Sequence, residues 1–251
     1  MPPQTENPEP GKRRVSLPAP LRREAATHVT NDRTLADKAY AAIHESIISG
    51  EYAPGDRLRI EDLAAALNLS PTPIREALHR LETSGLSEHV PHRGARVADL
   101  TIEDLQELSE ARLALEPLAV GKAAERMTAD TAAAARAHLE NQIAAEKKGD
   151  VSEAWKAHTA FHFALYEASG SRWLVRLITP LWESSQRYRL RWRPLWQDLH
   201  TRDGEHDEIL AACVAGSADR AAVLIHNHLA RTANLVAIQM VGAPLFQLKN
   251  L

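Results

Sequence analysis

Hydrophobic residues recur at helical spacing through most of this chain. The first run carries its apolar side chains at Leu35, Ala39, Tyr40, Ile43 and Ile47. This period of three to four residues predicts an amphipathic helix over residues 35–48, ended by Gly50. After a turn at Pro54-Gly55, the pattern predicts two further helices, over residues 60–67 and 71–84.

A shorter, alternating pattern follows these helices. Between residues 86 and 97, apolar and polar side chains alternate around the triplet His92-Arg93-Gly94. Alternation with a period of two, interrupted by a glycine, predicts a two-stranded hairpin. We call residues 34–100 the N-terminal head, and we expect it to contain three helices followed by this hairpin.

The second and third helices of the head have the sequence of a helix-turn-helix. A tight turn at Asn68 separates them, and the run Ser70-Pro-Thr72 opens the later helix with residue types that favour a helix start. A short helix, a tight turn and a second helix form the motif that reads the major groove of duplex DNA. The hairpin is then the wing of a winged helix-turn-helix. A plain helical hairpin without a DNA role is the alternative.

Helical periodicity governs the rest of the chain. Helices are predicted over residues 101–126, 129–148, 151–168, 171–192, 195–214 and 217–240. Thr101 and Asp104 resemble a capping box at the first of these starts. Six helices of this length can close one buried core. The predicted fold class is therefore mainly α: a winged helix-turn-helix head followed by an all-helical bundle of six helices, the helical domain (residues 101–240).

Both ends of the chain lack this periodicity. Residues 1–33 contain six prolines and scattered charge, so we expect a disordered tail. Residues 241–251 are expected to form a loose tail. The single cysteine, Cys213, excludes an intramolecular disulfide and fits a reducing compartment. No apolar run approaches the roughly 20 residues that span a bilayer, so we expect a cytoplasmic protein without a membrane partner.

Charge alone does not indicate a nucleic-acid partner. The chain has a net charge of −3, and the head itself holds seven Lys and Arg against ten Asp and Glu, also −3. A head that binds DNA must therefore gather its few arginines on one face.

Several stretches resemble one family of bacterial regulators. Those of the head that resemble GntR-type regulators are Ile48–Leu58, Thr72–Leu78 and Arg93–Val97. Those that resemble the FCD ligand-binding domain of the FadR subgroup are Ala111–Leu118, Phe161–Gly170, Glu205–Leu210 and His228-Leu229. The resemblance implies a homodimeric transcription regulator, usually a repressor, which binds a pseudo-palindromic operator.

The resemblance also assigns residues to the DNA contact. Arg75 matches a base-contacting arginine, and two hydrogen bonds from a guanidinium to guanine discriminate by roughly 1–3 kcal/mol. Thr72 matches a residue near phosphate at the helix start. The full expected set is Ser70, Thr72, Arg75, Arg80, His92, Arg93 and Gly94. Pro71 and Glu61 stand where the family usually has arginine, so the usual operator sequence is not implied.

Four histidines carry the second implied site. His158 and His162 lie four residues apart, on one face of a predicted helix. In the resembled family, four residues that match His158, His162, His206 and His228 hold a metal, and the first is usually aspartate. An all-nitrogen set suits a divalent transition metal, zinc first and nickel as the alternative. There are two other interpretations: His158 does not bind the ion, or the four histidines form a polar patch without a metal. His226 is the alternative to His228 as the fourth metal ligand, but the spacing typical of the family favours His228.

Arg112 and the arginine-rich run of residues 186–193 allow two interpretations each. The resemblance suggests that Arg112 holds the carboxylate of a small effector, whereas its spacing from Glu116 also fits a salt bridge on the helix surface. In residues 186–193 aromatic side chains alternate with arginine, which suits single-stranded nucleic acid or, more simply, a core-facing aromatic stripe.

The leading functional prediction is a DNA-binding regulator, most simply a repressor, whose operator affinity changes when a carboxylate effector binds near the metal. One alternative is that the ion itself is the signal. A metal-dependent hydrolytic enzyme is the other, but no motif of the helical domain supplies an obvious general base.

Overall fold

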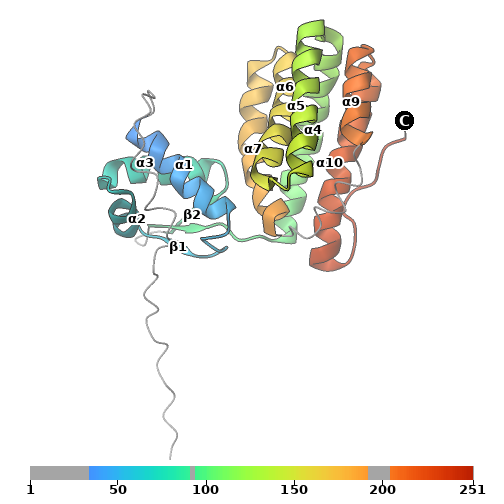
Figure 1. Ribbon diagram of the computed structural model, residues 1–251. Coiled ribbons are helices and arrows are strands. Elements are labelled where there is room, and N and C mark those ends of the chain that lie inside the picture. The colour runs from blue at the N-terminus through green and yellow to red at the C-terminus, as the bar shows by residue number, and fades with distance from the viewer. Residues whose placement is uncertain (1–33, 91–93, 192–203, 251) are drawn as a thin grey trace, which may run out of the picture.

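The N-terminal head is a winged helix-turn-helix. The computed structural model describes residues 34–90, 94–191 and 204–250. The helices of the head are α1 (Leu35–Ile48), α2 (Ile60–Leu67) and α3 (Pro71–Thr83). Its strands are β1 (Arg57–Leu58), β2 (Ser87–Val90) and β3 (Gly94–Val97), which pair antiparallel in the order β1-β3-β2 (Figure 1). The predicted tail of residues 1–33 and the wing residues His92 and Arg93 lie outside the described residues.

Local signals place the elements of the head as predicted. The Thr34 side chain caps α1 in a reciprocal capping box with Asp37. Asn68 ends α2 with φ of 52°, the left-handed conformation that asparagine tolerates, and so turns the chain sharply into α3. The head closes its own core, in which Ile43, Leu58 and Ile74 are fully buried. The strand β1 was not predicted, because two residues are too few to show a period.

The helical domain is a bundle of long helices (Figure 1). The helices described in it are α4 (Ile102–Arg126), α5 (Ala129–Lys147), α6 (Val151–Ala168), α7 (Arg172–Arg191), α9 (Gly204–Val214) and α10 (Ala218–Val241). Their described ends agree with the predicted ends to within one residue, apart from the start of α9, where residues 195–203 of the predicted helix lie outside the described residues. Core side chains that include Phe161, Leu165 and Ile225 are fully buried.

One local prediction about the helical domain needs correction. Thr101 caps α4 by accepting a hydrogen bond from the amide of Asp104, but the Asp104 carboxylate does not complete a capping box. It accepts instead from the Tyr188 hydroxyl at 2.6 Å and from Arg187 at 3.4 Å, and so ties α4 to α7.

The segment after α10 is not loose in its described part. Asn234 accepts from the amides of Leu245 and Phe246 and donates to the carbonyl of Phe246. Asn227, two helical turns earlier, donates to the backbone carbonyl of Lys249 and accepts from its amide. Side-chain amides of α10 therefore hold the segment along the helix.

The head contacts the helical domain through α7. The Tyr40 hydroxyl on α1 donates to the Glu183 carboxylate on α7 at 2.6 Å. One turn further along α7, the Arg187 guanidinium donates to the backbone carbonyl of Ala98 at 3.1 Å. Across the described ranges, no helix combines the length and the apolar character that a membrane crossing requires.

Candidate functional site

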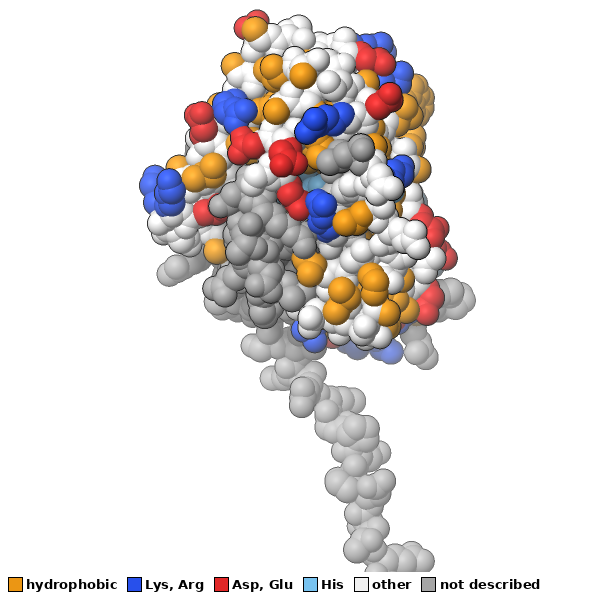
Figure 2. Space-filling model, turned by 90° about the vertical axis from the view of Figure 1, so that its right-hand side faces the viewer, with side chains coloured by type: hydrophobic (Ala, Val, Ile, Leu, Met, Phe, Trp, Pro, Cys, Tyr) orange, Lys and Arg blue, Asp and Glu red, His pale blue; other side chains and the backbone are white. Residues whose placement is uncertain are grey.

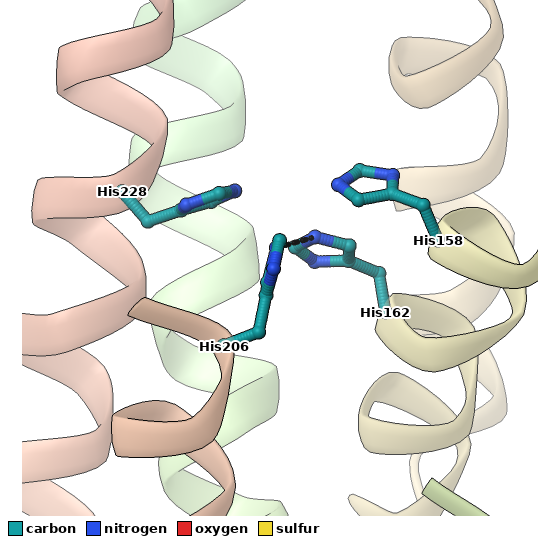
Figure 3. Close-up of side chains that lie close together, drawn as sticks. All are labelled: His158, His162, His206 and His228. Atoms are coloured by element: carbon teal, nitrogen blue, oxygen red, sulfur yellow. Dashed lines mark hydrogen bonds between the residues drawn. The ribbon is translucent and has the colours of Figure 1, made fainter. Parts of the chain in front are cut away.

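Four histidine side chains from three helices converge on one point in the helical domain (Figure 3). His158 and His162 come from successive turns of α6, His206 from α9 and His228 from α10. One ring nitrogen from each lies within 4.8 Å of the others. His206 is half-buried and the other three are buried. The structure thus brings together the four predicted residues, and His228 rather than His226 faces their centre.

The spacing of these nitrogens suits a single metal ion. The Nε2 atoms of His162 and His206 lie 3.2 Å apart. Nitrogens bound to one zinc at about 2.1 Å in a tetrahedron lie ~3.4 Å from each other. Neutral imidazole is also the nitrogen ligand that zinc, copper and nickel favour. In spacing and in donor type, the residues fit a divalent transition metal.

The outer nitrogens of two rings have oxygen partners. His228 Nδ1 lies 2.9 Å from the Glu205 carboxylate, and Arg231 donates to the other oxygen of Glu205 at 3.0 Å. His162 Nδ1 lies 3.2 Å from the Tyr166 hydroxyl. A hydrogen bond at Nδ1 selects the tautomer whose Nε2 carries the free lone pair, so both rings can present Nε2 to an ion.

Aromatic side chains enclose the histidines. Trp155 stacks on His158 with ring centroids 4.9 Å apart, and Trp182 of α7 lies 4.9 Å from His162. Trp182 is 2% exposed, so it separates the histidines from solvent on this side. Figure 2 shows a small histidine surface between acidic and basic side chains on the face turned to the viewer. Within the cluster, His206 is the half-buried member and therefore the most accessible of the four rings.

Arg112 is buried rather than on the surface of α4. Its Nε donates to the Glu116 carboxylate at 2.5 Å, and its exposed fraction is 7% against 0% for Glu116. Burial alone would lower the pKa of Arg112, but the adjacent Glu116 carboxylate outweighs it and raises the pKa above its usual value. The salt bridge is real, but its predicted place on the helix surface was wrong.

The same guanidinium lines a small cavity between α4, α7 and α10. This cavity measures about 20 Å³, room for roughly one water molecule. Its walls also include Ser109, Tyr188 and Thr232. Because Glu116 already occupies the guanidinium and the cavity is small, the geometry does not support a bidentate grip of Arg112 on an effector carboxylate.

The N-terminal half of α3 and its N-cap carry three exposed residues that were predicted to contact DNA. Ser70, Thr72 and Arg75 are exposed there, and no ion pair with the described residues engages Arg75. Gly94 opens β3 with φ of +87°, and a Cβ at this position would lie 3.4 Å from the backbone oxygen of Leu58. A side chain there would be strained, which explains a glycine beside the wing.

Arg80 differs from Arg75 although both lie on α3. Its guanidinium pairs with the Asp37 carboxylate at 2.7 Å and stacks over the Tyr40 ring at 4.2 Å. The hydrogen bond from Arg80 holds the pKa of Asp37 below its usual value. Arg80 therefore joins α1 to α3, and a phosphate would have to compete with Asp37 for it.

Sequence reasoning missed several side chains of these sites. Arg57 and Arg59 are exposed on either side of the buried Leu58, next to the wing, and the alternation Arg-Leu-Arg could have revealed them. Tyr166 lies four residues after His162, and Glu205 directly precedes His206, so spacing could have indicated both. The contact of Tyr40 with Glu183 joins residues 143 positions apart and has no local signal.

Comparisons with known proteins agree on one family. The model of bacterial regulatory proteins of the gntR family matches residues 35–97, and that of the FCD domain matches residues 107–231. The Uxu operon transcriptional regulator of Escherichia coli is 31% identical over 222 residues, 75% of this chain and 81% of that protein. The transcriptional repressor GlaR of the same species is 29% identical over 213 residues, 81% of this chain and 96% of that protein.

The fold is shared with a solved structure, that of Escherichia coli McbR/YncC. It covers 82% of this chain and 99% of that chain, with a TM-score of 0.71 and 24% identity. GlaR, the Uxu operon regulator and McbR are by name transcriptional regulators and not enzymes. The chain therefore belongs to the GntR family of bacterial regulatory proteins and is a transcriptional regulator with an FCD domain.

Proposed function

We propose that this regulator is a metal-loaded repressor whose operator affinity changes when a small carboxylate effector binds at the histidine centre. The main observation in support of this proposal is the convergence of four side chains on one point: His158, His162, His206 and His228. The head (residues 34–100) binds operator DNA in the cytoplasm, and the helical domain (residues 101–240) binds the metal and the effector.

The proposed operator contact uses the N-terminal half of α3 and its N-cap, Ser70. Arg75 is exposed and not engaged by an ion pair with the described residues, so it is available to a base edge. Ser70 and Thr72 lie at the start of α3, where Pro71 and Pro73 have no amide hydrogen and the Thr72 amide can attract a phosphate. In this proposal His92, Arg93 and Gly94 of the wing lie against the same duplex. Arg80 has the weakest support as a DNA contact, because its guanidinium pairs with Asp37.

The charge of the centre supports an anionic effector. The carboxylate of Glu116 is paired with Arg112, and that of Glu205 is paired with Arg231. A divalent ion held only by neutral imidazoles would therefore keep most of its charge. Since an uncompensated charge in a partly buried site attracts an anion, a carboxylate bound to the ion is the expected effector.

The helix α7 supports a route from this centre to the head. Trp182 contacts the His162 ring, and the next residue, Glu183, accepts the hydrogen bond from Tyr40 of the head. A ligand that shifts Trp182 also shifts Glu183, because both belong to the same helical turn. In energetic terms, such coupling between two sites is typically about 1–3 kcal/mol.

We propose that the functional unit is a homodimer. On the adjacent helices α4 and α7, Leu118 is 50% exposed, Trp173 70% and Leu177 48%. Apolar side chains of this size are a suitable surface for a second copy of the chain. A dimer also provides two heads for a pseudo-palindromic operator.

A second candidate function has its own support. Four nitrogen ligands complete the tetrahedral coordination of zinc, which leaves no position for an effector. The ion itself would then be the signal. His158 decides between the two functions, because three ligands leave a position open and four close it.

The experiment measures metal and effector separately. Operator duplexes selected from a random pool by the full chain are titrated with protein that is metal-free, zinc-loaded, or zinc-loaded with citrate as the probe. Effector control predicts that operator affinity changes on adding citrate to the zinc-loaded protein. A change on adding zinc alone, with no effect of citrate, selects metal control. Equal affinity in all three states would reject both.

A further inference from the structure

A chain of buried hydrogen bonds runs from Arg112 to the histidine centre. The Arg112 guanidinium donates to Glu116, the Tyr166 hydroxyl donates to the same carboxylate, and this hydroxyl lies 3.2 Å from His162 Nδ1. Arg112 is 7% exposed, and Glu116, Tyr166 and His162 are each 0% exposed. Four polar side chains at such depth cost stability unless each is satisfied, which this chain achieves.

The direction of the hydrogen bonds follows from the number of protons. A phenol has one hydroxyl proton, and Tyr166 donates it in its hydrogen bond to Glu116. The Tyr166 oxygen must then accept from His162, so the His162 Nδ1 carries a proton. In a neutral imidazole Nε2 is left with the lone pair, and the Nε2 of His162 faces His206 at 3.2 Å, at the centre of the cluster.

The same order of groups occurs on the opposite side of the centre. There His228 Nδ1 contacts the Glu205 carboxylate, and Arg231 holds Glu205. Each ring thus has an oxygen acceptor backed by an arginine, but the acceptor of His162 is a neutral phenol and that of His228 is a carboxylate. The phenol can act as a fixed acceptor only while Glu116 accepts the hydrogen bond from its hydroxyl, and the fully buried Glu116 carboxylate is held in place by its ion pair with Arg112.

We propose that Tyr166 is a positioning residue for the metal centre, and that the buried Glu116–Arg112 pair serves to keep its hydroxyl oriented. Together they fix the ring and the tautomer of His162, so that Nε2 faces the ion. Arg112 thus acts on the centre through Glu116 and Tyr166, rather than by binding an effector. This inference depends on the proposed function only in requiring that the centre binds metal.

The decisive variant is Tyr166→Phe, which removes the hydroxyl and keeps the ring. Outer-shell partners of metal-bound histidines typically contribute about 10–100-fold in metal affinity. The zinc affinity of Y166F is therefore expected to fall by about that factor, measured by competition with a chromophoric chelator on the full chain. Glu116→Gln is a poorer test, because it leaves the buried Arg112 without its counter-charge and can unfold the protein.

Tyr188→Phe is the matched control. The Tyr188 ring is also buried and its hydroxyl also donates to a carboxylate, that of Asp104, yet Tyr188 is not among the aromatic neighbours of the four histidines. If loss of a buried tyrosine–carboxylate hydrogen bond disturbs the bundle in general, both variants will lose zinc affinity equally. The proposal predicts that Y188F keeps the zinc affinity of the unmodified chain.

A spectroscopic readout separates positioning from general destabilisation. In metal-free protein labelled with ¹⁵N at histidine, the His162 resonances, assigned by their absence in His162→Gln, should show a protonated Nδ1. In Y166F this preference for one tautomer should be lost, with the other histidines unchanged. An unchanged His162 tautomer and unchanged zinc affinity in Y166F would overturn the proposal.

The outcomes also separate this proposal from the metal centre itself. If the unmodified chain binds no zinc above the level of His162→Gln, the metal centre is wrong. The proposal then fails with it, whatever the tautomer of His162. If the unmodified chain binds zinc and Y166F binds it equally well, the metal centre stands and only the positioning role of Tyr166 is rejected.

Discussion

The head and the helical domain present their functional side chains in opposite ways. Arg75 of the head is exposed, and among the described residues no ion pair engages it. In the helical domain, His162 and His228 are buried, and an outer hydrogen bond orients each ring. A DNA duplex supplies the partners of an exposed arginine, whereas a metal requires ligands that are already oriented. Exposed side chains therefore suit the first task and buried networks the second.

This contrast predicts the largest effect for a ligand of the buried centre. His162→Ala removes one nitrogen and leaves Tyr166 without its partner, so zinc affinity should fall by more than the roughly 100-fold that outer-shell partners contribute. Metal content after dialysis against a weak chelator measures this. His226→Ala, on the same buried stretch of α10 as His228 but outside the cluster, is the control and should retain the metal. Full occupancy in H162A would remove the centre.

The next effect is expected in the head. Arg75→Ala should reduce discrimination between operator and unrelated duplex by about 5–150-fold, because a bidentate contact with guanine is worth roughly 1–3 kcal/mol. Thermal stability should change little, since the side chain is exposed. Fluorescence anisotropy with both duplexes measures the ratio. If R75A retains full discrimination, α3 does not read bases through this residue.

A smaller effect is expected where the two regions meet. Tyr40→Phe removes the hydrogen bond to Glu183, a contribution of about 1 kcal/mol. Zinc affinity should stay unchanged, but the change in operator affinity between metal-free and ligand-loaded protein should shrink several-fold. Tyr52→Phe, a buried tyrosine within the head, is the matched control. An undiminished response in Y40F would exclude the Tyr40–Glu183 contact as part of the route.

The smallest expected effect concerns pH. Burial lowers the pKa of His44, whose Nε2 has no hydrogen-bond partner among the described residues, while the neighbouring Glu183 partly opposes this. The unfolded chain therefore binds a proton at His44 more readily than the folded one, so stability falls as the pH drops below about 6.5. Chemical unfolding at pH 8 and pH 5.5 measures this loss, which His44→Gln should reduce. Burial also lowers the pKa of His226, so part of the loss of stability at low pH should remain in His44→Gln.

Sequence alone predicted the long elements well, because amphipathic periodicity extends over many residues. The helix α1 has its predicted bounds, and α5 ends one residue before its predicted end. The histidine cluster was also predicted, from the spacing of His158 and His162 and from the order of the family motifs. Predicting the helix bounds and predicting the histidine cluster do not require knowing which face of a helix is buried.

The errors concern burial and contacts that are distant in sequence. The spacing of Arg112 and Glu116 shows that they share a face of α4, but not that this face points into the bundle. The segment after α10 lacks periodicity, and its order depends on Asn227 and Asn234, whose partners only the fold brings near. The contact between Tyr40 and Glu183 likewise has no signature in local sequence.

The most direct test compares operator affinity of the full chain with and without an occupied histidine centre. The account predicts that zinc, or zinc with citrate, changes the affinity of the unmodified protein by about 5–150-fold, the range that a coupling of roughly 1–3 kcal/mol produces. His162→Ala should bind the operator with one affinity under all these conditions. An unmodified protein whose operator affinity is the same in every state, or an H162A variant that responds fully, would contradict the account.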